Sequence, residues 1–186
     1  MSSRRKFIQS AALASAGMAV GSFSATAKSY SRIIGANKKV NLACIGIGNR
    51  GGEILNALHG TGLANIVALC DIDMGAPHTQ KSIDKFPGAK RFQDFREMLD
   101  KMGNEIEAVS VGVPDFSHFP ITMMAMGLGK HVYVEKPMAR TFYEIELMMA
   151  AAKKYNKVVT QMGNQGHSEA NYFQFKAWKD AGIIKD

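Results

Sequence analysis

The sequence predicts an α/β protein with a parallel, doubly wound sheet. Apolar runs of strand length alternate with segments whose apolar residues recur at helical spacing, and this alternation is typical of βαβ units. The first predicted strand ends in a glycine-rich turn that opens a helix, and the second ends in two closely spaced aspartates. A hydrophobic content of 46% in 186 residues supplies enough apolar material for a core.

Three strand–helix units are predicted first. Their strands are short apolar runs, and each following helix carries apolar residues three or four positions apart. Gly60 ends the first helix, and Pro87 with Gly88 ends the second. In chain order the elements are a strand at 40–45, a helix with Ile54, Ala57 and Leu58, a strand at 64–70, a helix at 80–86, a strand near 90–92 and a helix with Phe95, Met98, Leu99 and Met102.

Three further units follow by the same two periods. Gly127 and Gly129 close the first of their helices, and Ser168 is the expected N-cap of the last. In chain order the elements are a strand at 108–113, a helix with Ile121, Met124, Ala125 and Leu128, a strand at 132–134, a helix at 142–155, a strand at 158–161 and a helix at 172–178.

The N-terminus has the order of a removable export signal. A charged segment containing Arg4 and Arg5 precedes a weakly apolar run rich in Ala, Gly and Ser, which ends in Ala-Thr-Ala. The paired arginines resemble the twin-arginine class of bacterial signals, and the run is too short and too weakly apolar for a membrane span. We therefore expect periplasmic localisation, with no stable membrane insertion after the signal is removed. The expected divisions are a signal at 1–27, a linker at 28–39, a nucleotide-binding domain at 40–162 and the start of a second domain at 163–186.

Composition excludes several other classes of protein. The net charge is +7, but no long basic block or basic stripe with aromatics occurs, so nucleic-acid binding is not expected. Two cysteines, Cys44 and Cys70, are too few for a disulfide scaffold or a four-cysteine zinc site, and we predict buried thiols at both. The histidines show no ligand spacing joined to acids or cysteines, so no metal site is predicted.

A glycine motif lies where the first strand meets the first helix. It fits the pattern G-x-G-x-x-G, which by itself is a weak signal in a chain with 18 glycines. In this position the first glycine allows a tight turn, the second lets a pyrophosphate approach the backbone, and the third lets helix and strand pack closely. The helix N-terminus then offers free N–H groups to the phosphates. The predicted cofactor-binding residues of the motif are Gly46, Gly48, Asn49, Arg50 and Gly51.

An acidic pair marks the end of the second strand. Asp71 lies about 25 residues after Gly46, near the expected place for a carboxylate that accepts hydrogen bonds from the adenosine ribose hydroxyls. Asp73 adds a second negative charge that would repel a 2′-phosphate. The sequence therefore predicts a dinucleotide cofactor, with NAD favoured over NADP.

Polar motifs also follow the later strands, and together with the glycine motif they resemble a known family. The motifs are Pro114-Asp115 with His118, then Glu135-Lys136-Pro137, then Gly163-Asn164-Gln165-Gly166-His167. In this order they are similar to the Gfo/Idh/MocA oxidoreductases, most of all to members exported by the twin-arginine route. The resemblance covers residues 40–186, and its most specific part is the Glu-Lys-Pro signature.

The resemblance implies a Rossmann domain that holds NAD(P), followed by a second domain that covers the nicotinamide and shapes a pocket for a sugar, cyclitol or related polyol. It implies that Lys136 lies beside the nicotinamide and the substrate hydroxyl, as the catalytic residue; without it, Lys136 would be read as a solvated loop lysine. Pro137 would hold Lys136 out of helical geometry. Many members carry a histidine where this chain has Phe116.

The remaining candidates each have a plainer alternative. Glu135 could pair with a backbone or ribose group, or be a surface carboxylate. Pro114, Asp115 and His118 are expected beside the cofactor, and Gln165 could reach the nicotinamide carboxamide or serve only the loop backbone.

The chain ends where the resemblance expects the second domain to begin its sheet, so we expect a fragment of a longer, homo-oligomeric protein. The exposed last helix, with Phe173, Phe175 and Trp178, would then favour self-association. Three functions remain open: an oxidoreductase with tightly bound NAD(P), an NAD-dependent glycoside hydrolase of the same family, and a catalytically incomplete nucleotide-binding module.

Overall fold

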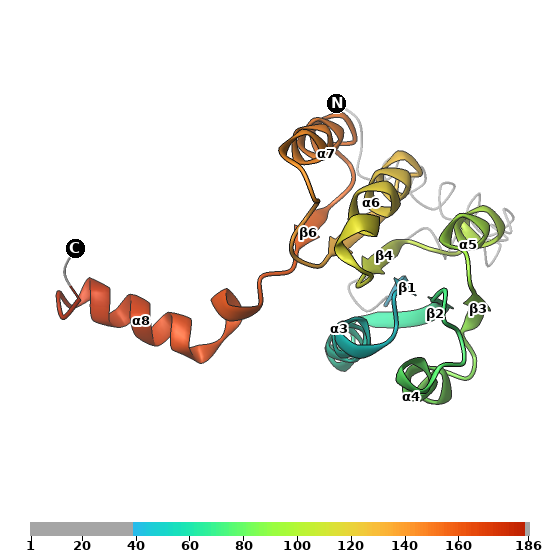
Figure 1. Cartoon of the computed structure of the whole chain (residues 1–186), viewed down its shortest axis with the longest axis horizontal. Helices are drawn as coiled ribbons and strands as arrows, with labels where there is room; N and C mark the ends of the chain where they lie inside the picture. The colour runs from blue at the N-terminus through green and yellow to red at the C-terminus, as the bar shows by residue number, and fades with distance from the viewer. Residues whose placement is uncertain (1–38, 185–186) are drawn as a thin grey trace, which may run out of the picture. The chain divides into compact units, whose positions relative to one another are not determined.

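The computed structural model describes residues 39–184. Its strands form one parallel six-stranded sheet in the order β3-β2-β1-β4-β5-β6 (Figure 1). This is the order of doubly wound dinucleotide-binding sheets. The strands after β1 are added on one side of it as far as β3 and on its other side from β4 onward, so the switch point lies between β1 and β4. The predicted fold class is confirmed. The predicted signal peptide and the linker up to residue 38 lie outside the described residues.

Strands and helices alternate along the chain as predicted. The strands are β1 (Val40–Ile45), β2 (Ala64–Cys70), β3 (Lys90–Phe92), β4 (Ala108–Val111), β5 (His131–Val134) and β6 (Thr160–Met162). The α-helices are α3 (Asn49–Gly60), α4 (Pro77–Lys85), α5 (Phe95–Met102), α6 (His118–Gly127), α7 (Phe142–Lys154) and α8 (Ala170–Asp180), and the 3-10 turns are η1 (Asp115–Ser117) and η2 (Gln165–Ser168).

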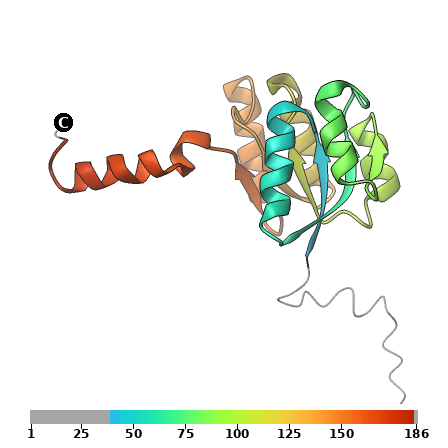
Figure 2. The same cartoon turned by 90° about the horizontal axis from the view of Figure 1, so that it is seen from below.

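Two apolar cores lie on opposite faces of the sheet. Helices α3 and α4 cover one face and α5, α6 and α7 cover the other (Figures 1 and 2). Alternate residues of β1 serve the two cores, since Leu42 and Cys44 pack toward α3 while Ala43 and Ile45 pack toward the other helices. Because strands of a parallel sheet are buried on both faces, they read as continuous apolar runs in the sequence.

The boundaries differ from the predicted ones by a few residues. Helix α4 begins at Pro77, ahead of the predicted start at Gln80, because proline is favoured in the first helical turn, where its missing N–H costs nothing. Strand β4 ends at Val111 because Gly112 and Val113 already belong to the turn that faces α3. Strand β6 lies two residues later than its predicted start.

The end of the described chain is largely exposed. No residue of α8 is buried, and β6 is exposed along its length. The predicted cap of the last helix is wrong: Glu169 is the N-cap, without a side-chain hydrogen bond, while the Ser168 hydroxyl donates to the Asn164 carbonyl. Ser168 instead closes the η2 turn, because its hydroxyl reaches a carbonyl four residues back.

Candidate functional site

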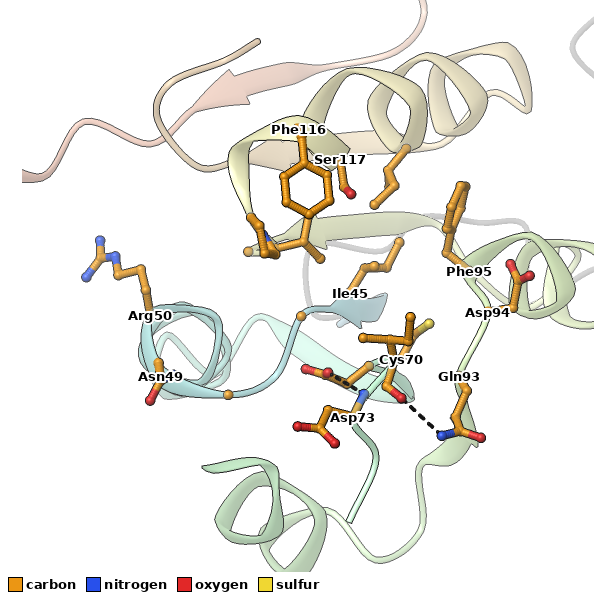
Figure 3. A pocket seen from close by; sticks show the side chains of 18 of the residues that line it. Ile45, Asn49, Arg50, Cys70, Asp73, Gln93, Asp94, Phe95, Phe116 and Ser117 are labelled. Carbon is orange, nitrogen blue, oxygen red and sulfur yellow. Dashed lines mark hydrogen bonds between the residues drawn. The ribbon is translucent and has the colours of Figure 1, made fainter. Parts of the chain in front are cut away.

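A pocket of about 620 Å³ opens at the carboxyl ends of β1, β2 and β4. This is the switch point of the sheet, where helices on opposite faces leave a crevice. Six of the predicted cofactor-binding residues line it: Gly46, Gly48, Asn49, Arg50, Asp71 and Pro114. Figure 3 shows that the pocket is bordered by the start of α3 on one side and by the residues before α5 on the other.

Three glycines bring the start of α3 against the sheet. Gly46 has a φ of +78°, and a Cβ on it would lie 2.5 Å from the Gly112 carbonyl oxygen. A Cβ on Gly51 would collide with the Gly46 carbonyl oxygen and lie 2.9 Å from that of Gly112. A Cβ on Gly112 would in turn lie 2.6 Å from the Gly51 Cα. The roles predicted for Gly46 and Gly51 match this packing, while the part of Gly112 was not predicted.

The second glycine of the motif faces a histidine. A Cβ on Gly48 would collide with Cδ2 of His78, which comes from the first turn of α4. The Nε2 of His78 lies 3.8 Å from a carboxylate oxygen of Asp73. His78 therefore forms part of the pocket wall beside the glycine turn, a placement that nothing in its sequence context indicates.

Asp71 ties the glycine turn to the end of β2. Its Oδ2 accepts a hydrogen bond from the Ile47 N–H at 2.9 Å, and its Oδ1 accepts one from the Asp73 N–H at 3.0 Å. An ionised carboxylate has about four acceptor positions, so positions remain for ribose hydroxyls. Asp71 is thus both at the predicted place for ribose recognition and a support for the turn that approaches the phosphates.

Apolar and polar side chains that were not predicted form the opposite wall. Phe95 and Phe116 border the same hollow from α5 and η1 (Figure 3). The Gln93 side chain donates to the Ile72 carbonyl at 3.1 Å, which holds the end of β3 against the turn after β2. Apolar and aromatic side chains next to a few fixed polar groups are typical of small-molecule pockets. For Gln93 and Phe95, the sequence signal was their position just after strand β3.

Asp94 organises the start of α5 at the edge of the pocket. Its carboxylate caps the helix by accepting from the Arg96 N–H at 2.8 Å, and it pairs with the Arg96 guanidinium. These bonds lower the pKa of Asp94 to about 2. The carboxylate is therefore ionised throughout the physiological range, and its negative charge stays at the rim.

The Arg50 side chain points away from the pocket (Figure 3). It pairs with Glu53 on the surface, at 2.9 Å, and with Glu135 at 3.0 Å. Both carboxylates raise the pKa of Arg50, with the hydrogen bond to Glu53 as the larger cause. Glu135 is buried rather than on the surface, and it follows β5, so Arg50 joins the glycine motif to the Glu-Lys-Pro segment.

Lys136 is exposed beyond the end of β5, and its peptide bond to Pro137 is cis. It does not line the 620 Å³ pocket. Its position still follows the strand next to β4, at the same carboxyl edge of the sheet as the glycine turn. The predicted catalytic residue is therefore placed beside the switch point but outside the enclosed part of the pocket.

His118 is buried beneath this edge. Its Nδ1 lies 2.6 Å from the Pro137 carbonyl oxygen and its Nε2 2.8 Å from that of Val113. Both ring nitrogens are thus engaged with backbone, which does not favour the prediction that the ring contacts a cofactor or substrate. The ring instead holds the turn after β4 and the turn after β5 together.

Two further predicted cofactor-binding residues do not contribute to the lining of the pocket. Asp115 begins η1 and Gln165 begins η2, and neither lines the pocket. Cys44 and Cys70 are buried free thiols, as predicted, and burial raises the pKa of each to about 12.

Within residues 39–184, no three His, Cys, Asp or Glu side chains gather closely enough to hold a metal ion. No helix of that range combines the length and apolarity that crossing a membrane requires.

The residues of the pocket fit a dinucleotide. Gly46 and Gly48 line the pocket with backbone in place of side chains where the phosphates would approach, and the first turn of α3, which Gly51 lets lie close to the sheet, faces the same space. A carboxylate stands at the end of β2, where a ribose would lie.

Comparison with known proteins agrees with this geometry. Residues 40–163 match the Gfo/Idh/MocA family, described as "Oxidoreductase family, NAD-binding Rossmann fold". An inositol 2-dehydrogenase of Salmonella paratyphi B is 29% identical over 142 residues, which are 75% of this chain and 41% of that protein. A glycosyl hydrolase family 109 protein of Saccharopolyspora erythraea is 26% identical and is matched over 90% of this chain and 40% of its own length.

A solved structure shares the fold. The crystal structure of myo-inositol 2-dehydrogenase from Lactobacillus plantarum superposes with a TM-score of 0.71 at 24% identity, covering 80% of this chain and 43% of that one. The chain spans about two fifths of the length of the inositol 2-dehydrogenase and of the Saccharopolyspora protein.

Proposed function

The chain belongs to the Gfo/Idh/MocA family of NAD-binding oxidoreductases, and from that premise we propose that it supplies the nucleotide-binding half of an enzyme that oxidises a sugar, cyclitol or related polyol. The observation that carries the proposal is the pocket at the switch point, where the interlocked glycines and Asp71 meet. The similarity to inositol 2-dehydrogenases supports a polyol as the substrate class.

The residues of the first half of the sheet would hold the cofactor. The backbone of the turn from Gly46 to Gly48 and the first turn of α3 would bind the pyrophosphate, because free N–H groups and the helix dipole favour an anion there. Asp71 would accept hydrogen bonds from the adenosine ribose. When bound, the nicotinamide ring supplies hydride acceptance and return.

Lys136 would act on the substrate. An ammonium beside a substrate hydroxyl lowers the cost of deprotonating it, because the positive charge stabilises the oxygen anion that forms. The lysine lies on the carboxyl edge of the sheet, and its backbone N–H donates to the Glu135 carboxylate at 3.0 Å. In this role Lys136 stabilises the oxygen anion by its charge and by its position beside the substrate hydroxyl.

NAD is the proposed cofactor. Asp71 and Asp73 place two carboxylates at the ribose end of the pocket, and a 2′-phosphate would bring a further negative charge close to both. Asp94 adds a third at the rim, although it is paired with Arg96. The proposed preference for NAD over NADP follows from the negative charge of these carboxylates.

Titration of the 186-residue chain with NAD and NADP, followed by calorimetry, tests the cofactor assignment. We expect NAD to bind more tightly than NADP, and Asp71→Asn to weaken NAD binding by about 10- to 100-fold, the range of a lost hydrogen bond to a charged group. Asp84→Asn, on α4 outside the pocket, is the matched control and should leave the affinity unchanged. Equal binding of NAD by the wild-type chain and the Asp71→Asn variant would contradict the assignment.

A second function is favoured by the similarity to glycosyl hydrolase family 109 proteins. In such a reaction a hydride would pass from the sugar to the cofactor, the glycosidic bond would break with water replacing the leaving group, and the hydride would return to the sugar, so that NADH does not accumulate. Release of free reducing sugar from an aryl glycoside without net NADH would select this function over the oxidoreductase. Tight NAD binding with neither activity in the native gene product would leave a nucleotide-binding module.

Export by the twin-arginine route is part of the proposal. Arg4 and Arg5 precede a weakly apolar run, in the order of such signals. A protein beyond the cytoplasm meets no pool of free NAD, so the cofactor would be loaded before export and remain bound. The native protein would be periplasmic, and we propose that it is a homo-oligomer. Fusing residues 1–27 to a reporter should export it, and replacing both arginines by lysine should abolish export.

A further inference from the structure

A buried carboxylate lies between the glycine motif and the predicted catalytic lysine. The Glu135 side chain is only 5% exposed. Its Oε1 accepts hydrogen bonds from Nε and Nη2 of Arg50, at 3.2 and 3.0 Å. Its Oε2 accepts the backbone N–H of Lys136 at 3.0 Å. One carboxylate therefore joins the first turn of α3 to the backbone of Lys136.

The surroundings leave this carboxylate little freedom. A Cβ on Gly163, directly after β6, would lie 2.7 Å from Glu135 Oε1 and 2.8 Å from the Tyr133 hydroxyl. Burial and the negative charge of Glu135 raise the pKa of Tyr133. The first turn of α3, through Arg50, and the ends of β5 and β6 thus meet around Glu135.

We propose that Glu135 is a positioning residue, which sets the backbone of Lys136 relative to the glycine motif through Arg50 and does not itself touch the cofactor. We therefore replace the predicted cofactor-ligand roles of Glu135 and Arg50 by a structural link between them, the brace, because Glu135 is buried and does not line the pocket and the Arg50 side chain points away from it (Figure 3). The functional meaning of the brace rests on the proposed function, in which Lys136 faces the substrate.

The geometry requires a carboxylate and not merely a polar group. Glu135 accepts with both oxygens, one toward a cation and one toward an N–H. A glutamine has one acceptor oxygen and one donor NH₂, so it would present a donor to either Arg50 or the Lys136 N–H. Glu135→Gln keeps the volume and loses one side of the brace.

The test is amide hydrogen exchange in the 186-residue chain, followed by NMR. In Glu135→Gln we expect the Lys136 amide to exchange about tenfold or more faster, because its charged acceptor is lost. The amides of Glu135 and Gly163, which donate to the Val111 and Val134 carbonyls, are internal references and should change by less than about twofold. A general loss of stability would accelerate all three amides together and would overturn the proposal.

Arg50 supplies a second variant and its own control. Arg50→Lys keeps the charge but loses the fork of N–H groups, and it should also accelerate the Lys136 amide. Glu53→Gln removes the surface partner of Arg50, a side chain 69% exposed, and should leave that amide unchanged. If Arg50 acts through Glu135, the double variant Arg50→Lys/Glu135→Gln exchanges no faster at Lys136 than Glu135→Gln alone. Additive acceleration would overturn the coupling.

Cofactor binding separates this proposal from the function on which it rests. Glu135→Gln should bind NAD within about threefold of wild type, since the carboxylate does not contact the cofactor; a loss of tenfold or more would reinstate Glu135 as a ligand and overturn the proposal. Failure of the wild-type chain to bind NAD would defeat the proposed function, whereas the exchange rates at Lys136 would still decide whether the brace exists.

Discussion

At the scale of single residues, the absence of side chains shapes the site as much as their presence. Gly46, Gly51 and Gly112 form one contact in which each leaves no room for a Cβ on the next. This contact lets the first turn of α3 approach the sheet closely enough to border the pocket. The motif spacing indicates only two of these glycines, since Gly112 lies far away in the sequence.

Replacing Gly51 by alanine should destabilise the fold. The added Cβ would meet backbone atoms of Gly46 and Gly112, which can move only with the sheet, so we expect a loss of about 1–3 kcal/mol in the free energy of unfolding. Gly60→Ala, at the exposed end of the same helix with nothing within 4 Å of the added Cβ, should instead gain about 0.5–1 kcal/mol. Denaturant unfolding of both variants measures the difference, and equal effects would contradict this packing.

Polar residues at the strand ends show why residue roles are harder to predict than residue positions. Asp71 lies where the motif places it, yet its carboxylate also supports the Ile47 N–H. His118 follows a strand end as predicted, yet it is buried between two carbonyls. In both cases the local sequence indicates that the residue lies at the edge of the sheet, whereas a hydrogen-bond partner of its side chain comes from a different segment of the chain.

At the scale of elements, capping side chains help to determine where helices α5 and α7 begin. Thr141 and Glu144 form a capping box at α7, in which each side chain bonds the backbone of the other. Asp94 caps α5 and pairs with Arg96 beside the pocket. These contacts satisfy N–H groups that the helices leave free and fix where each helix begins.

The cap at α5 should make a pH-dependent contribution to stability. The pKa of Asp94 is lowered from 3.8 to about 2 in the folded chain, so its stabilising effect is complete above about pH 4 and is lost as the pH falls toward 2. The difference in unfolding free energy between wild type and Asp94→Ala should therefore shrink over that interval. Thermal unfolding at a series of pH values measures it, with Asp100→Ala, later in the same helix, as the control. A difference that stays constant down to pH 2 would refute the role of the ionised cap.

At the scale of the whole molecule, the sheet order decides what meets at the pocket. The order reverses between β1 and β4, and helices on opposite faces diverge there. The turns after β1, β2 and β4 come together although they lie far apart in the sequence. The carboxyl end of β5 is next to them, which brings the Glu-Lys-Pro segment to the same edge.

The exposed aromatic residues of α8 should cause the chain to self-associate. Phe173, Phe175 and Trp178 are 61%, 51% and 44% exposed, and clustered apolar side chains in water favour association. Sedimentation over a range of concentrations should show a rising average mass, and replacing the three residues by serine should reduce it. A wild-type chain that stays monomeric at every concentration would count against the expectation.

The sequence by itself determined the alternation of strands and helices, the doubly wound class and the glycine motif with Asp71, because these depend on local periodicity and on spacing within one βαβ unit. Only the tertiary structure decided which residues share the pocket, that Gly112 completes the glycine contact, and that His78 and Phe95 stand at its walls. It also decided that Glu135 is buried against Arg50. These facts join segments far apart along the chain, and their contacts follow from the order and register of the strands, which no local pattern of residues encodes.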